Sequence, residues 1–234
     1  MKDITIIGCE VLRDEICSLA HDCDVEFLPG RLHFRRRELR ETLAERIAAV
    51  PDGRTVLLGF GRCAIAGGSL EAGTHRLVVP AIDNCVALLL GSEAIYRHEM
   101  KQHPGTLYYT RGWTQGMDDP YAMYLQARER LGGEAADRWA ELLFANYSRV
   151  ALIEADSLPM APCRRYVDRV ADCSGLPLET VSGSLGLLEK LICGPHDDDV
   201  IVVPPGNVLD DRSFRHHVRR RRATLRAELE PSLC

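Results

Sequence analysis

The sequence lacks any apolar run of the roughly 20 residues that a membrane-spanning helix requires. Its first residues read as a strand, Ile4 to Ile7, and not as the charged and apolar segments of a secretory signal peptide. We therefore expect a cytoplasmic protein with no membrane contact.

An excess of positive charge is also absent. The 234 residues carry a net charge of -5, with a pI near 5.9, so the molecule as a whole gives no reason to expect nucleic acid as a partner. Two local basic runs occur, Arg35–Arg37 and Arg219–Arg222. We expect them on solvated helix faces, and binding of an anionic partner is the alternative.

Paired cysteines are missing as well. None of the nine cysteines belongs to a C-x-x-C pair, so the spacing excludes a zinc ribbon or knuckle. The odd count, in a reducing compartment, argues against a disulfide framework. The glycines at 61, 67 and 68 match neither a Walker A loop nor a dinucleotide fingerprint. Any site must therefore be assembled from loops that are distant in sequence.

What the sequence does contain is an alternation of apolar runs and amphipathic segments. Strand-like runs near residues 4–7, 25–28, 56–58 and 77–80 alternate with helical patterns, and the same alternation resumes after residue 107. It predicts an α/β fold with two Rossmann-like lobes, residues 1–103 and 104–234, whose parallel sheets face an interlobe cleft. One continuous sheet with a switch point is the alternative.

Three predicted strands end in a small-residue loop that carries a cysteine. Cys9, Cys63 and Cys85 each follow such a strand. The carboxyl ends of neighbouring parallel strands lie about 5 to 10 Å apart, and open α/β sheets bind ligands at that edge. We predict metal or cluster ligation by these thiols; a catalytic thiol and core packing are the alternatives. Four other cysteines, Cys17, Cys163, Cys173 and Cys193, fall on apolar stripes of predicted helices and are expected in the core.

Two further residues are candidates for the same site. His33 follows a Pro-Gly turn after a predicted strand, and as a fourth ligand it would complete a Cys3His set. A hydrogen-bonded surface histidine is the alternative. Asp83 is a candidate ligand or an acceptor that orients one. Three thiolates suit either a [4Fe–4S] cluster with one open iron or a zinc ion.

Other residues suggest a small-molecule ligand in the cleft. Trp113, with Tyr108 and Tyr109, would wall the cleft and stack on a flat ligand, and core packing is the alternative. Ser182 and Gly183 precede a predicted helix, whose free N–H groups would bind an anion. A simple helix cap is the alternative there.

Several short motifs, taken in order, resemble the domain-of-unknown-function family 1638 (DUF1638). They are residues 9–12 (CEVL), 28–33 (LPGRLH), 59–63 (GFGRC), 104–109 (PGTLYY) and 202–206 (VVPPG). The resemblance spans nearly the whole chain. In the loop at 81–85, AIDNC replaces the Arg-x-His-Asp-Cys of the family pattern, while the thiol is kept.

The resemblance carries no assigned activity. Members of the family are often encoded beside corrinoid-dependent methyltransferases, which implies an enzyme or accessory factor of one-carbon, methyl or sulfur metabolism. It also implies a corrinoid methyltransferase system as partner. The alternative is a non-enzymatic protein that delivers a corrinoid or a metal to the methyltransferase.

Overall fold

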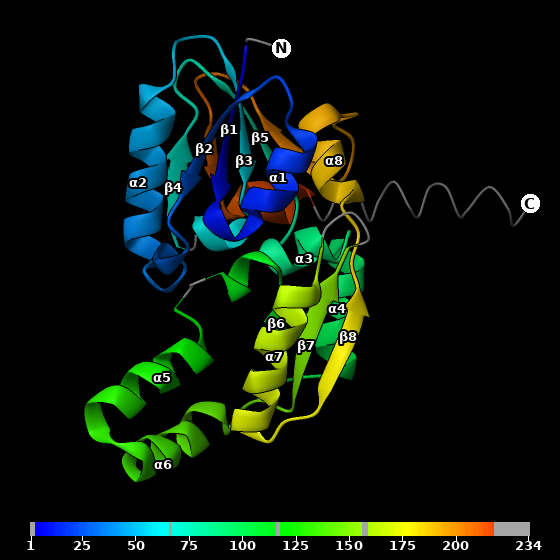
Figure 1. Ribbon diagram of the computed structural model, residues 1–234. Coiled ribbons are helices and arrows are strands. Elements are labelled where there is room, and N and C mark those ends of the chain that lie inside the picture. Colours follow the sequence, from blue (N-terminus) through cyan, green and yellow to red (C-terminus); the bar gives the residue numbers. More distant parts are fainter. Residues whose placement is uncertain (1–2, 66, 116–117, 156–158, 218–234) are drawn as a thin grey trace, which may run out of the picture.

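The computed structural model describes residues 3–65, 67–115, 118–155 and 159–217. They form a mixed α/β protein with two main sheets, as Figure 1 shows. The predicted α/β class with parallel pairing is therefore confirmed. Arg219–Arg222 lie outside the described residues.

The first sheet has five strands in the order β2-β1-β3-β5-β9. Its strands are β1 (Ile4–Cys9), β2 (Asp24–Leu28), β3 (Thr55–Gly59), β5 (Arg76–Pro80) and β9 (Val200–Val203). The first four are parallel, whereas β9 pairs antiparallel with β5. β1, β3 and β5 are apolar runs, almost entirely buried, as expected for parallel strands covered on both faces.

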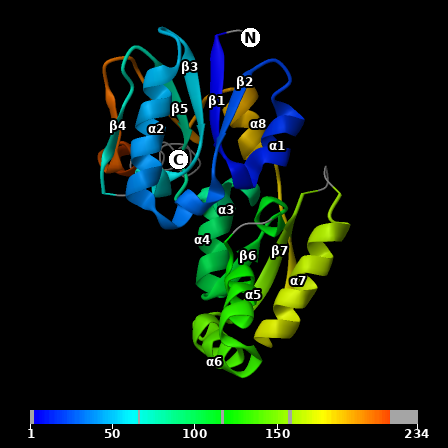
Figure 2. The same ribbon diagram turned by 60° about the vertical axis from the view of Figure 1, so that its left-hand side comes forward.

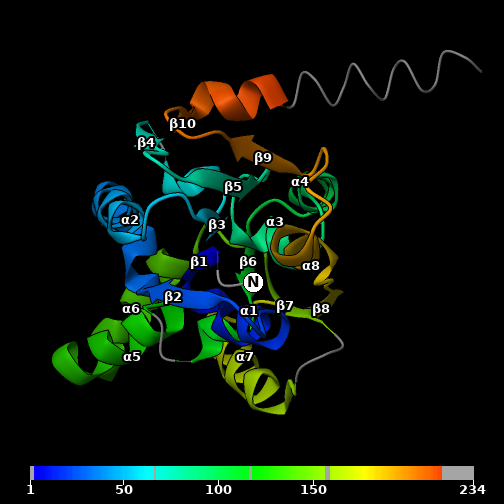
Figure 3. The same cartoon turned by 90° about the horizontal axis from the view of Figure 1, so that it is seen from above.

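Helices cover both faces of this sheet (Figure 3). α2 (Arg36–Ala49) lies on one face and buries Leu39, Leu43 and Ile47, which recur every four residues. α1 (Arg13–Leu19) and α8 (Gly186–Cys193) lie on the other face. A small antiparallel pair, β4 (Ser69–Glu71) and β10 (Val208–Asp210), lies beside α2.

The second sheet has three parallel strands in the order β6-β7-β8. They are β6 (Thr106–Tyr109), β7 (Arg149–Glu154) and β8 (Leu178–Ser182). α7 (Ala161–Ser174) and α4 (Glu93–Gln102) lie on its opposite faces, and the hairpin of α5 (Pro120–Leu131) and α6 (Gly133–Phe144) extends from it (Figures 1 and 2). This unit has its own hydrophobic cluster, which includes Tyr109, Phe144 and Val167.

The boundary expected at residue 103 does not hold for the end of the chain. β9 pairs with β5, and α8 buries Leu187, Leu188 and Leu191 in the core of the first sheet. The reason is apolar burial: the buried positions of β9, and α8 itself, find their partners on β5 and β3. Residues 106–182 therefore form a unit inserted between two parts of the first.

Within the described residues, no helix combines the length and apolar character needed to cross a membrane.

Candidate metal centre and cleft

The carboxyl ends of four neighbouring strands carry the predicted ligands. In sheet order, β2 leads to His33, β1 ends at Cys9, β3 leads to Cys63 and β5 leads to Cys85. Each end turns at once into a short helical segment. These are η1 (Glu10–Leu12), η2 (Gly30–Phe34), η3 (Arg62–Ala64) and α3 (Cys85–Leu89), of which the first three are 3₁₀ turns. The expected adjacency of the three cysteine-bearing strands is confirmed.

The loops that carry Cys63 and Cys85 bind each other directly. The Cys63 N–H donates to the Asp83 carbonyl at 3.0 Å, and the Arg62 N–H donates to the Ile82 carbonyl at 2.9 Å. Gly61 makes this approach possible, because a Cβ there would lie 2.8 Å from the Asn84 nitrogen and the Ile82 oxygen. The two thiol-bearing segments are therefore fixed relative to one another by their backbones.

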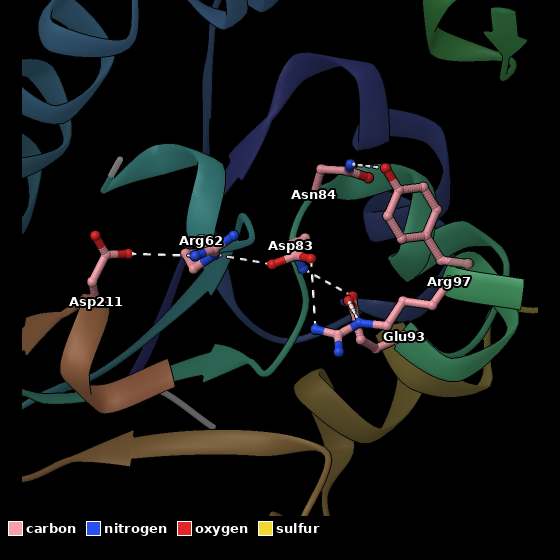
Figure 4. A network of polar contacts seen from close by, with 7 residues as sticks. Arg62, Asp83, Asn84, Glu93, Arg97 and Asp211 are labelled. Atoms are coloured by element: carbon pink, nitrogen blue, oxygen red, sulfur yellow. Dashed lines mark hydrogen bonds and ion pairs between the residues drawn. The ribbon is translucent and has the colours of Figure 1, made fainter. Parts of the chain in front are cut away.

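Side-chain hydrogen bonds and ion pairs further hold the Cys85 loop in place, as Figure 4 shows. Asp83 accepts a hydrogen bond from Arg62 at 2.9 Å and forms an ion pair with Arg97 at 3.7 Å. The Asp83 N–H donates to Glu93 at 2.9 Å. Asn84 caps α3 through the Val86 N–H at 3.0 Å. Asp83 thus acts in this structure as an anchor for the loop.

The Cys9 and His33 segments also meet. The Gly30 N–H donates to the Glu10 carboxylate at 3.3 Å, which joins the turn after β2 to the end of β1. The His33 ring packs edge-on against Phe34 and Trp113, with both centroid distances 5.4 Å. Burial, with the nearby charge of Arg36, holds the pKa of His33 below its ordinary value. A neutral imidazole is the form that binds a metal.

Cys9 and Cys85 are buried, Cys63 is partly buried, and the three thiols influence one another. Burial raises the pKa of Cys9 to about 12, and the Cys63 thiol adds to the effect. Burial also raises the pKa of Cys85 well above the ordinary value, and both other thiols contribute. Burial raises the pKa of Cys63 as well, although Arg36 opposes it. Thiols coupled in this way lie close together and are neutral without a compensating cation.

The thiols do not surround a single point. Across the residues that the structure describes, no group of three or more His, Cys, Asp or Glu side chains is arranged to hold one metal ion. Of the four cysteines expected in the core, Cys163 is buried and Cys173 is partly buried, whereas Cys17 and Cys193 are exposed, so the prediction is wrong for these two.

A cavity of about 220 Å³ lies between the two sheets, and we call it the aromatic cavity. Its walls include His33, Phe34, Cys85, Tyr108, Tyr109 and Trp113. Trp113 belongs to the 3₁₀ turn η4 (Gly112–Thr114), which follows β6. Tyr108, Tyr109 and Trp113 thus line one cavity together with Cys85.

A second cavity of about 370 Å³, the polar cavity, adjoins it. It is lined by His33, Arg36, Arg62, Cys63, Asp83 and Asp211, and also by Gly67 and Asn84. His33 and Asn84 line both cavities, so the two meet at these residues. One thiol is thus presented to each side, Cys63 to the polar cavity and Cys85 to the aromatic one.

Ser182 and Gly183 do not form the expected anion site. The Gly183 N–H donates to the Glu154 carbonyl at 2.7 Å, and the Ser184 N–H donates to Leu89 at 2.8 Å. These donors are occupied by carbonyls, since β8 ends against β7 and α3. Neither Ser182 nor Gly183 lines the two cavities.

The sequence did not single out two residues at this site, Phe34 and Arg36. Phe34 directly follows His33 and Arg36 lies three residues after it, and Arg36 was assigned with its basic neighbours to a solvated face. The usable signal was their position after the Pro-Gly turn, because the η2 turn carries the whole segment into the cleft.

Comparison with known proteins gives one family. The family model DUF1638, described as a protein of unknown function, matches residues 27–192. No curated protein matches the chain. No solved structure matches it.

Proposed function

The chain belongs to the DUF1638 family of proteins of unknown function, and we propose that its Cys9, Cys63 and Cys85 bind a metal centre, in the first place an iron–sulfur cluster. The observation that carries the proposal is the meeting of three thiols from three adjacent strand ends. A buried cysteine packs as a small apolar residue, but the convergence of three of them at the ligand-binding edge of one sheet favours a shared ligand.

The electrostatics of the thiols support a bound cation. Burial of three mutually interacting thiols raises their pKa values, so free thiolates here are costly. A metal reverses this effect, because its positive charge stabilises the thiolate and lowers the pKa of a coordinating thiol. The same burial argues against Cys63 or Cys85 as a free catalytic thiolate.

We place a cluster before zinc because the ligands of a cluster need not surround one atom. In a [4Fe–4S] cluster each cysteine binds its own iron atom, so the ligands stand further apart than those of one ion. Thiols that interact without surrounding a single point fit the wider arrangement. Zinc, with His33 as fourth ligand, is the alternative metal and would require these loops to close further.

Three thiolates leave one iron of a cluster without a protein ligand. The aromatic cavity beside Cys85 would admit a small molecule to that position. We propose on this basis an enzyme or accessory factor of one-carbon, methyl or sulfur metabolism.

A corrinoid in the cleft fits less well. The aromatic cavity of about 220 Å³ is below the range of roughly 300 to 1,000 Å³ that encloses a drug-sized ligand, and a corrinoid is larger still. Metal delivery to a methyltransferase is the better form of the non-enzymatic alternative. Cys63 favours it, since this thiol is partly exposed in an open cavity and can pass an ion to a partner.

The test is metal analysis of protein purified without oxygen. We expect equimolar iron and sulfide with broad visible absorption, and we expect Cys63→Ser and Cys85→Ser to remove both. Cys17→Ser is the matched control, because that thiol is exposed on α1, and it should keep the metal. Metal-free wild-type protein that remains folded would reject the proposal, and one stoichiometric zinc would replace the cluster with zinc.

A further inference from the structure

The two adjoining cavities differ in chemistry, and the difference describes a ligand. On one side lie the aromatic walls beside Cys85, and on the other lie the charged walls beside Cys63. Because His33 and Asn84 line both, the two cavities are neighbours, and one ligand spanning them would meet both kinds of wall. Its two ends must then match two different surroundings.

The aromatic end is shaped for a flat, apolar group. His33, Phe34 and Trp113 contact one another edge-on, with 6.3 Å between the Phe34 and Trp113 centroids. Phe34 is nevertheless 61% exposed. An exposed phenylalanine at the rim of a cavity offers a face that a bound ring can cover.

Tyr108 and Tyr109 line this cavity, but their hydroxyls do not describe the ligand. Neighbouring residues of a strand point to opposite faces of a sheet, and both hydroxyls are buried without a well-formed hydrogen bond among the described residues. The Tyr108 hydroxyl lies near Thr106 and Arg149, and the Tyr109 hydroxyl lies near Asp119. The aromatic rings are therefore the feature that characterises this end of the cleft.

The polar end carries one available positive charge. Arg62 is engaged by Asp83 at 2.9 Å and lies 3.9 Å from Asp211. The Arg36 guanidinium, by contrast, makes no ion pair or hydrogen bond with any residue that the structure describes. Its field nevertheless reaches the site, since it lowers the pKa of both His33 and Cys63.

We propose that the cleft binds a small aromatic carboxylate, with the ring in the aromatic cavity and the carboxylate on Arg36. A planar guanidinium pairs with a carboxylate through two parallel hydrogen bonds. This inference deepens the proposed function by naming the ligand that would lie beside the thiols.

Charge and size exclude other ligand classes. A cationic ligand would meet Arg36, and a polyanion such as a nucleotide would meet the carboxylates of Asp83 and Asp211 on the same walls. A large ring system such as a corrinoid exceeds the aromatic cavity of about 220 Å³. A small flat aromatic group with one negative charge fits both ends.

The experiment is calorimetric titration of the full chain with benzoate and with the uncharged benzamide, with metal content measured on the same sample. We expect saturable benzoate binding below about 10 mM and at least tenfold weaker benzamide binding. Arg36→Gln should weaken benzoate about tenfold and leave benzamide unchanged. Arg37→Gln is the matched control, since Arg37 pairs with Glu41 on the solvated face, and it should bind as the wild type does.

Absence of benzoate binding to the folded wild type would overturn this inference, as would equal affinity for benzamide. Unchanged benzoate affinity in Arg36→Gln would do the same. None of these results bears on the thiols. Metal-free wild-type protein that still binds benzoate would instead reject the metal centre and support the carboxylate site. The two proposals can therefore fail separately.

Discussion

Gly112 lies so close to Val11 that a Cβ on the glycine would be 2.0 Å from the Val11 carbonyl oxygen. The two residues belong to η4 and η1, the turns that follow β6 and β1. Their contact joins the segment that carries Cys9 to the segment that carries Trp113. The aromatic wall of the cleft is therefore fixed to the Cys9 segment through a direct backbone contact.

Gly112→Ala should separate these turns. Any added Cβ must displace the Val11 backbone, so we expect a loss of about 1 to 3 kcal/mol in the free energy of unfolding, measured by urea denaturation. Trp113 fluorescence should also shift, since the indole moves away from His33. Gly133→Ala is the control, because a Cβ there meets nothing within 4 Å. Equal stability of the two variants would contradict the prediction, since it would show that the Val11 backbone moves aside at little cost.

Asp83→Asn should weaken the metal centre without unfolding the protein. The change removes the charge that pairs with Arg62 and Arg97, and these partly exposed pairs contribute at most about 1 kcal/mol each. The Cys85 loop would lose its anchor, and loss of such a supporting contact lowers metal affinity by about tenfold or more. Competition with a chelator measures this affinity.

The control for that variant is Asp24→Asn. Asp24 pairs with Arg54 at the start of β2, the opposite end of the sheet from the thiols. It should lose no metal affinity. An equal loss of metal affinity in both variants would show that general destabilisation causes the effect.

Arg149→Met should destabilise the second sheet. The Arg149 side chain is 5% exposed, binds Glu99 at 2.6 Å and also pairs with Glu179. Removing it leaves a shielded carboxylate on α4 unpaired, and breaking a buried pair costs about 3 kcal/mol. Thermal unfolding measures the loss. Arg138→Met, which breaks an exposed 4.0 Å pair with Glu134, should change stability by less than about 0.5 kcal/mol.

Glu15 should make stability fall as pH rises. Burial raises its pKa from 4.5 to about 7; the neighbouring Asp14 adds to this and Arg111 opposes it. Between about pH 4.5 and pH 7 the folded protein retains a proton that the unfolded chain has lost. The free energy of unfolding therefore falls by up to about 3 kcal/mol between these pH values and stays constant above pH 7.

Glu15→Gln removes this dependence. The variant should be more stable than the wild type at pH 8, with a flatter stability curve between pH 4.5 and 7. Glu129→Gln, on the exposed surface of α5, should follow the wild type. A wild-type curve that is already flat in this window would contradict the prediction.

Much of the fold was predictable because its signals are local. Periodicity indicated most of the helices and the strands of both main sheets. The partner of β9 was not predictable, since an apolar run such as residues 200–203 does not encode which strand edge it will join or in which direction.

The site was predictable to the same extent. The position of Cys9, Cys63 and Cys85 after strands indicated a shared edge, because parallel strands place their ends together. The role of Arg36 was not visible, since its sequence neighbours are also arginines and only tertiary structure separates the one at the cleft from those in solvent. The hydrogen bond of the Gly183 N–H was not predictable for the same reason, because the Glu154 carbonyl that accepts it lies on β7, 29 residues earlier.

The antiparallel pairing of β9 with β5 has a consequence for synthesis on the ribosome. The outer edge of β5 has no strand beside it until Val200–Val203 has left the exit tunnel, by which time the inserted unit is already made. A nascent chain thus exposes an open β edge, the kind of surface that pairs with other chains. Stalled or prematurely terminated products of this gene should for that reason be the aggregating species, while the finished chain seals the edge itself.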